Sequence, residues 1–305
     1  MPKRNLLLCV FLFSLFPLGC GKDAANVQQP VDNSRTLVTF AAMGDVPYGL
    51  TKEAIEAEEE ILKAQLIDLN KDETIGFTVH VGDIKKGAIP CKEGVYETVS
   101  EILETSKVPV FIIPGDNEWN DCKDPKEAWE FWETHFMRFD EKWDHEFDVK
   151  RQKGRKENFA FLENGVLFLG LNLVGGKIHK KKEWESMIED DLDWLTKQFS
   201  EHSSSVSSAV VFIHANPGKL DGDEFDHKKE EYKPIIKFLD KETAKHFPKP
   251  ILMIHGDGHK WIHDFPFPNA GSRITRVQVT QGGLEAPLKV EVTDNPDQPF
   301  RLTRR

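Results

Sequence analysis

Five short hydrophobic runs in this chain each stop at a residue whose side chain can bind a metal ion. The runs span residues 37–43, 75–79, 108–113, 209–213 and 251–254. They are rich in β-branched and aromatic residues and are closed by Gly or Pro, which is typical of buried strands. Segments with helical periodicity lie between them, at residues 52–69, 94–105, 125–139, 182–199 and 228–247. This alternation of strands and helices predicts a layered α/β domain.

The alternation becomes less regular after residue 157. Two hydrophobic runs, 159–161 and 166–171, flank the sequence Glu163-Asn164-Gly165. An Asn-Gly pair between hydrophobic runs predicts a β-hairpin, because both residues accept positive φ. Further strands are expected at residues 274–279 and 288–292. We expect two facing sheets with helices outside them and no second domain.

Oxygen and nitrogen donors follow all five predicted strands. These donors are Asp45, His80 with Asp83, Asp116 with Asn117 and Glu118, His214, and finally His255, Asp257 and His259. A single Gly-Asp pair after a strand is commonly only a turn, because Gly tolerates positive φ and Asp bonds its own backbone. In open α/β sheets, however, ligands bind beyond the carboxyl ends of the strands. Five such endings therefore favour one shared metal site.

The first twenty residues differ from the rest of the chain. Lys3 and Arg4 precede an uncharged hydrophobic stretch at residues 6–18, and Gly19-Cys20 follows. This is the pattern of an export signal, and the stretch is short for a transmembrane span. Cys20 makes it resemble a bacterial lipoprotein signal, in which cleavage before the Cys leaves a lipidated N-terminus. Simple secretion into the periplasm or medium is the alternative.

Residues 1–20 are thus expected to be an export signal, and the polar residues 21–35 a flexible tether. Loss of residues 1–19 would remove two positive charges and change the formal net charge from −11 to −13. An acidic exported domain is a poor candidate for nucleic-acid binding. The basic stretch 150–156 is interpreted as a solvated loop in preference to a phosphate-docking surface.

Two cysteines, Cys91 and Cys122, lie in the loops after the second and third predicted strands. In an oxidising compartment they could form one disulfide that braces the two loops. Two unpaired buried thiols are the alternative.

The order of the strand-end motifs resembles that of the calcineurin-like metallophosphoesterases. The likeness runs from Gly44 to His259 and rests on GDVPY, HVGDI, GDNEW and HGDGH, which are similar to the motifs of an exported bacterial branch. It implies that residues 36–305 form a four-layer α/β sandwich, with two central mixed sheets flanked by helices. It also implies two metal ions that share one Asp, and a metal-bound hydroxide that attacks phosphate esters.

The resemblance assigns ligands residue by residue. Asp45 matches the carboxylate of the first metal, Asp83 the bridge, and His214 and His259 the histidines of the fourth and fifth motifs. In the third motif Asp116 stands where the family has an Asn ligand; a shift of one residue would make Asn117 the ligand, and both stay open. Asp257 replaces the first His of the fifth motif and can still bind a metal. The expected metal ligands are therefore Asp45, Asp83, Asp116, Asn117, His214, Asp257 and His259.

Several positions depart from the family pattern. Pro47 stands where the first motif usually has a His ligand, and Lys86 where purple acid phosphatases supply a Tyr after the bridging Asp. Asn117 occupies the position of the His that assists the leaving group. His80 and His255 are the available imidazoles, either as proton donors or as hydrogen-bonding partners of the ligands.

The oxygen-rich ligand set favours two divalent or mixed-valence ions, with Mn or Fe first and Zn or Mg as alternatives. The expected function is hydrolysis of a small-molecule phosphate ester outside the cytoplasm. The alternative is a catalytically degenerate metal-binding receptor or scaffold.

Lys85, Lys86 and Arg138 could meet the substrate phosphate or be surface cations. The aromatic residues of the helix at 125–139 are interpreted as core, with a ligand platform as the other possibility.

Overall fold

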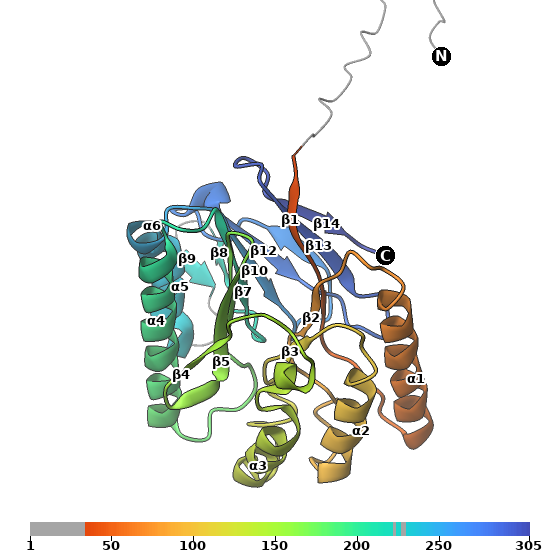
Figure 1. The fold of residues 1–305 in the computed structure, drawn as a ribbon. Helices are drawn as coiled ribbons and strands as arrows, with labels where there is room; N and C mark the ends of the chain where they lie inside the picture. Colours follow the sequence, from red (N-terminus) through yellow and green to blue (C-terminus); the bar gives the residue numbers. More distant parts are fainter. Residues whose placement is uncertain (1–33, 222–223, 227–229) are drawn as a thin grey trace, which may run out of the picture. The chain divides into compact units, whose positions relative to one another are not determined.

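Two β-sheets face each other, with helices on their outer sides, in the computed structural model, which describes residues 34–221, 224–226 and 230–305 (Figure 1). The first sheet has the order β14 (Phe300–Thr303), β13 (Leu288–Thr293), β1 (Thr36–Met43), β2 (Phe77–His80) and β3 (Val110–Ile112). The predicted export signal and nearly all of the predicted tether lie outside the described residues. No helix among the described residues has the length and hydrophobicity needed to cross a membrane.

The second sheet has seven strands. Their order is β11 (Ile262–Asp264), β12 (Ile274–Gln278), β10 (Ile251–His255), β7 (Ser208–Phe212), β6 (Val166–Gly170), β5 (Arg155–Glu163) and β4 (Lys150–Gln152). A separate hairpin pairs β8 (Lys219–Asp221) with β9 (Glu224–Asp226). Each large sheet contains parallel and antiparallel pairs, so both are mixed, as expected.

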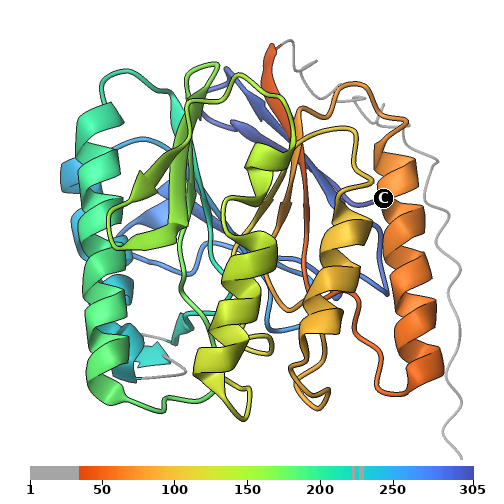
Figure 2. The ribbon, with the colours of Figure 1, turned by 60° about the horizontal axis from the view of Figure 1, so that its bottom comes forward.

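The helices cover the two outer faces. The three helices α1 (Lys52–Leu69), α2 (Glu93–Leu103) and α3 (Pro125–Phe136) lie side by side on the first sheet (Figure 2). The second sheet is covered by α4 (Lys181–His202), η2 (Glu230–Tyr232), α5 (Lys233–Lys237), the π-helical η3 (Phe238–Glu242) and α6 (Thr243–His246). Short 3-10 turns form η1 (Phe139–Lys142) and η4 (Gly271–Arg273).

Three hydrophobic layers hold this arrangement together. The central layer lies between the sheets and is rich in phenylalanine; Phe77, for example, contacts Phe40 at 5.2 Å and Phe168 at 5.1 Å between ring centroids. Each outer layer packs one sheet against its helices. Burial on both faces explains why the central strands read as continuous hydrophobic runs in the sequence. The predicted four-layer sandwich is confirmed.

The predicted hairpin is also confirmed, because β5 pairs with β6 and only Asn164 and Gly165 connect them, both with positive φ. The prediction of a solvated loop at residues 150–156 is wrong. This segment forms β4 and the start of β5, joined by a tight turn at Gly154 with φ of 87°. Charged residues suit a strand at the edge of a sheet, and such a strand lacks the hydrophobic pattern that would reveal it.

Candidate metal centre

The loops that follow β1, β2, β3, β7 and β10 carry the strand-end donors. β1, β2 and β3 run parallel to one another, and so do β7 and β10, so their carboxyl ends lie on common sheet edges. Side chains from these loops form two groups of potential metal ligands. The groups are Asp45, Asp83 and His259, and Asp83, Asp116 and His214. Within each group the donor atoms lie within 4.8 Å of one another, and Asp83 belongs to both.

The distances inside the two groups suit metal ions. Nε2 of His214 lies 3.3 Å from Oδ1 of Asp83 and 3.2 Å from Oδ1 of Asp116. Nε2 of His259 lies 3.1 Å from Oδ1 of Asp45, yet both Asp45 oxygens are buried without a hydrogen-bond partner among the described residues. Ligands about 2.1 Å from one ion are themselves roughly 3 Å apart. A cation would therefore compensate the buried Asp45 carboxylate, and the residues fit one.

The backbone of the centre is held in an unusual conformation. Asp45, Asp83, Asp257 and His259 all have positive φ, between 54° and 66°. Left-handed backbone in a residue with a side chain costs about 1 kcal/mol or more and is found at functional sites. Gly256 lets the backbone come close to Asp45, because a Cβ at this position would lie 2.6 Å from Oδ2 of Asp45.

Negative charge is concentrated in this buried space. Burial raises the pKa of Asp83, and the nearby Asp116, Glu118 and Asp45 raise it further, while His214 lowers it. Burial disfavours the charged form of His214, but the surrounding carboxylates outweigh it and raise the pKa of the imidazole. Such mutual repulsion is what a bound cation relieves.

His214 is oriented by a backbone carbonyl. Its Nδ1 lies 2.7 Å from the carbonyl oxygen of Val81, which accepts the Nδ1 proton. The other ring nitrogen, Nε2, then faces Asp83 and Asp116. This is the arrangement of a metal-binding imidazole, in which one nitrogen is fixed by a hydrogen bond and the other coordinates.

In the third motif, Asp116 and Asn117 occupy different positions. The Asp116 carboxylate belongs to a ligand group, whereas the amide nitrogen of Asn117 donates to Oδ2 of Asp83 and to the Tyr48 hydroxyl. Glu118 is fully buried, and its Oε1 accepts hydrogen bonds from the backbone of Asp83 (3.0 Å) and of Gly115. Glu118 therefore ties the third loop to the second.

His80 and His255 are buried beside the centre and contact the backbone. The Nε2 of His80 lies 3.0 Å from the carbonyl of Val46, and its Nδ1 accepts from the backbone of Gly82 at 3.2 Å. Burial lowers the pKa of His80 to about 4, so its ring is neutral near pH 7. Nδ1 of His255 lies 3.0 Å from the carbonyl of Gly256. For His80 this geometry favours the hydrogen-bonding role over proton donation.

The remaining expected site residues lie at the margin. Oδ2 of Asp257 accepts from the backbone of Asn216 at 3.3 Å, and Asp257 belongs to neither ligand group. Lys85 is buried and donates to the carbonyl of Ile89 at 2.8 Å, while Arg138 pairs with Glu141. The ammonium of Lys86 lies 5.2 Å from the Tyr48 ring centroid. Lys85 and Lys86 thus both lie near the centre, but the ammonium of Lys85 is engaged with a backbone carbonyl.

Tyr48 was missed by the sequence reasoning. Its hydroxyl donates to Oδ2 of Asp83 at 3.1 Å, and its ring contacts that of His259 edge-on at 4.8 Å. Burial and the charge of Asp83 raise its pKa. In the sequence, only its position three residues after Asp45 distinguishes Tyr48. The resemblance to purple acid phosphatases directs attention instead to a tyrosine three residues after Asp83.

Cys91 and Cys122 form a disulfide, with their Cα atoms 5.9 Å apart. The bond joins the loop after β2 to the loop after β3, and these loops carry Asp83 and Asp116. The disulfide thus connects two segments of the metal centre, which decides between the alternatives left open by the sequence.

No protein-family model matches this chain, and no curated protein matches its sequence. Solved structures do match, although at low identity. The chain is similar to GAP50, the anchor in the inner membrane complex of Plasmodium, with 13% identity, a TM-score of 0.51, and 88% of this chain and 89% of that one covered.

Two similar structures are enzymes by name. A purple acid phosphatase, PPD1 from yellow lupin, has 10% identity and a TM-score of 0.53, with 88% of this chain and 51% of that chain covered. A 5'-nucleotidase from Candida albicans has 13% identity and a TM-score of 0.52, with coverage of 89% and 52%. This chain thus spans about half the length of each enzyme. At these identities the likeness shows the fold alone, which is the α/β sandwich of these three structures.

Proposed function

We propose that this protein hydrolyses a phosphate ester with two metal ions held by the two ligand groups. The observation that carries the proposal is the position of Asp83, whose carboxylate lies in both groups. One shared carboxylate between two sets of donors is the arrangement expected of a dinuclear centre. Metal ions at such a centre clamp the phosphoryl oxygens and lower the pKa of water.

The residues of the chain have distinct tasks in this proposal. Asp45 and His259 hold one position, Asp116 and His214 the other. Tyr48 and Asn117 orient the shared Asp83 through hydrogen bonds, so that both of its oxygens have a defined direction. Because phosphoryl transfer needs mainly positioning and charge, this fixed geometry accounts for much of the expected catalysis.

The charge at the margin of the centre completes the site. Lys86 lies beside Tyr48 and is the cation best placed to meet a phosphate oxygen. The pKa of His259 is raised by its contact with Asp45, and its side chain is 38% exposed, so the imidazole is accessible to a substrate. His259 is thus a member of one ligand group and is also in contact with the solvent.

The lupin and Candida structures, which are named as a phosphatase and a nucleotidase, support a hydrolase on this fold. The alternative is a metal-binding receptor or scaffold without turnover. GAP50, which has a similar fold, is named as an anchor, and this name is compatible with a scaffold. The imidazoles missing at Pro47, Asn117 and Asp257 are the sequence features that favour this alternative.

We also propose that the protein acts outside the cytoplasm, anchored by a lipid on Cys20 or released after cleavage of residues 1–20. The basic and hydrophobic pattern before Cys20 supports export. Mass spectrometry of the N-terminus tests the anchor, and Cys20→Ala should release the protein from the membrane fraction. The expected substrate is a small-molecule phosphate ester, with no nucleic-acid partner.

The first experiment measures metal content and turnover together. Purified protein is analysed for bound metal, then assayed with a phosphomonoester and a phosphodiester in the presence of Mn, Fe, Zn or Mg. About two metals per chain with turnover supports the hydrolase. Bound metal without turnover of either ester would favour the receptor or scaffold, and absence of metal would contradict both.

A further inference from the structure

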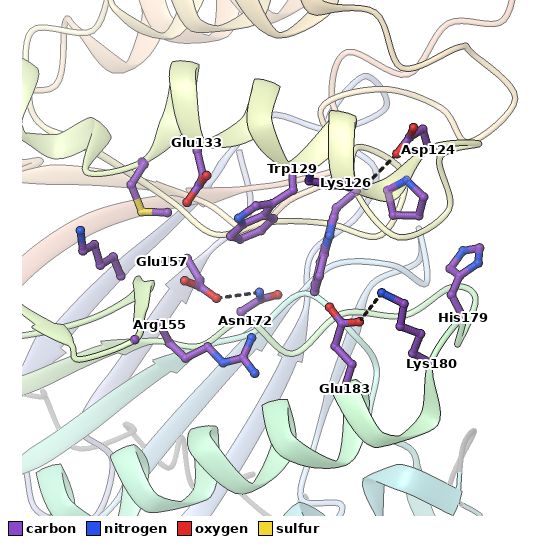
Figure 3. A pocket seen from close by; sticks show the side chains of 15 residues that line it. Asp124, Lys126, Trp129, Glu133, Arg155, Glu157, Asn172, His179, Lys180 and Glu183 are labelled. Carbon is purple, nitrogen blue, oxygen red and sulfur yellow. Dashed lines mark hydrogen bonds and ion pairs between the residues drawn. The ribbon is translucent and has the colours of Figure 1, made fainter.

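A cavity of about 660 Å³ lies between α3 on one side and β5 and the start of α4 on the other. Its lining includes Trp129 and Glu133 from α3, Glu157 from β5, and Asn172 from the loop after β6. Figure 3 shows the Trp129 indole reaching across the cavity toward Glu157 and Asn172. None of these residues belongs to the ligand groups of the metal centre, so the cavity is a separate feature.

The floor of the cavity is rich in hydrogen-bond acceptors. Glu157 is 4% exposed and Asn172 is 1% exposed. The amide nitrogen of Asn172 donates to Oε1 of Glu157 at 3.0 Å, but Oδ1 of Asn172 is buried and has no hydrogen-bond partner among the described residues. A buried acceptor without a donor costs about 1–3 kcal/mol. A ligand that carries N–H groups would supply the missing donor.

Two carboxylates of the cavity lack a cationic partner. No ion pair within the described part of the chain joins Glu133 or Glu157 to a lysine or arginine. Burial raises the pKa of Glu157, the hydrogen bond from Asn172 and the charge of Arg155 lower it, and the negative charge of Glu133 raises it again. A positive charge bound between the two carboxylates would relieve both of the effects that raise it.

Three basic residues of the lining are paired with other acids. Nε of Arg155 lies 2.9 Å from Asp190, the ammonium of Lys126 lies 3.6 Å from Glu130, and that of Lys180 lies 3.5 Å from Glu183. Lys156 is exposed at the rim of the cavity. The ion pairs of Lys126, Arg155 and Lys180 are therefore formed with acids other than Glu133 and Glu157, and of these three cations only the charge of Arg155 also acts on Glu157.

Two tryptophans form the hydrophobic part of the wall. Trp129 is half-buried, and its ring centroid lies 4.9 Å from that of Trp119, with the two planes inclined by 53°. Trp132 is stacked on Trp129 with ring centroids 5.2 Å apart, and it is buried in the core and holds the indole in place. Inclined indole faces next to carboxylates attract cations through both the ring quadrupole and the charge.

We propose that this cavity binds a small organic ammonium ion, such as a primary or methylated amine. Its N–H groups would donate to Glu157 and to Oδ1 of Asn172, and its carbon atoms would pack on Trp129 and Trp119. An anion would meet two unpaired carboxylates. A neutral nucleobase could stack on the indole but would leave the charge of Glu133 and Glu157 uncompensated. The proposal does not depend on the metal centre.

Binding is tested on the full chain by isothermal titration calorimetry and by tryptophan fluorescence. Ethanolamine and N-methylethanolamine are the ammonium probes, 1-propanol is the neutral counterpart of ethanolamine, and adenosine represents a nucleobase. We expect both ammonium ions to bind and to change the fluorescence, and 1-propanol to bind at least about tenfold more weakly. Equal binding of 1-propanol, tighter binding of adenosine, or no response to either ammonium ion would overturn the proposal.

Variants locate the binding. Glu157→Gln keeps the shape of the floor but removes its charge, and it should weaken ethanolamine binding about tenfold. Glu101→Gln, an exposed position on α2, is the matched control and should bind as the unaltered protein does. Thermal unfolding checks that each variant folds. If Glu157→Gln does not fold, the exposed Glu133→Gln provides the same comparison, and undiminished binding in the folded variant would refute the site.

Discussion

The hydroxyl of Tyr48 lies 3.1 Å from Oδ2 of Asp83 and links the loop after β1 to the loop after β2. The amide nitrogen of Asn117, in the loop after β3, donates to the same hydroxyl at 2.7 Å and to the same carboxylate. Three loops thus meet at one carboxylate. Because Asp83 belongs to both ligand groups, its orientation affects both proposed metal positions.

Tyr48→Phe should weaken metal binding about 10- to 100-fold, because a residue that orients a ligand typically contributes that much. The ring contact with His259 is kept, so only the hydroxyl is tested. Tyr96→Phe is the control, since it removes a buried hydroxyl that bonds the carbonyl of Glu118 and no ligand side chain. Equal metal affinity of the two variants, measured by calorimetry, would refute the orienting role.

Asp83→Asn should reduce bound metal from about two ions to one or none, measured by mass spectrometry of the metals. The same change should raise the melting temperature of the metal-free protein by a few degrees, because one charge leaves a buried cluster of carboxylates. Asp148→Asn, on an 81% exposed side chain, should change neither value. Unchanged metal content in Asp83→Asn would refute the shared position.

Reduction of the Cys91–Cys122 disulfide should destabilise the protein by about 2–4 kcal/mol, because the bond closes a loop between two segments of the centre. The melting temperature with and without reductant measures this loss. The double variant Cys91→Ser, Cys122→Ser should melt with the reduced protein and should no longer respond to reductant. A reductant effect of equal size in that variant would show that the disulfide is not its cause.

Asp191 on α4 should make stability fall as the pH rises. It is fully buried, Oδ1 accepts from Asn158 at 2.6 Å, and burial raises its pKa from 3.8 to about 8. Between these values the folded state binds more protons than the unfolded state, so the free energy of unfolding decreases with pH.

Asp191→Asn removes this dependence. The variant should therefore gain stability relative to the unaltered protein between pH 5 and pH 8, by an amount on the order of 2–4 kcal/mol. Urea unfolding at several pH values measures the difference, with the exposed Asp148→Asn as a variant that should follow the unaltered protein. Parallel pH profiles for Asp191→Asn and the unaltered protein would show that Asp191 does not hold a proton in the fold.

Much of the fold could be predicted from local patterns. The hydrophobic runs of β1, β2, β7 and β10 are buried on both faces, so they are visible in the sequence without their partners. The hairpin at Asn164-Gly165 is specified by its turn residues. In contrast, β4 depends on its position at the edge of the sheet, and the helical segment at 230–246 is broken, with Pro234 in the first turn of α5.

The sequence by itself determined the central strands, most of the helices that cover them and the donors at five strand ends, because each is a property of neighbouring residues. Only the tertiary structure decided that Tyr48 contacts Asp83 and that Trp129 faces a cavity. It also decided that the Asp116 carboxylate joins a ligand group and that the amide nitrogen of Asn117 bonds Asp83. These relationships join loops that are distant along the chain. Their geometry follows from how two sheets and their helices pack, and no local pattern encodes it.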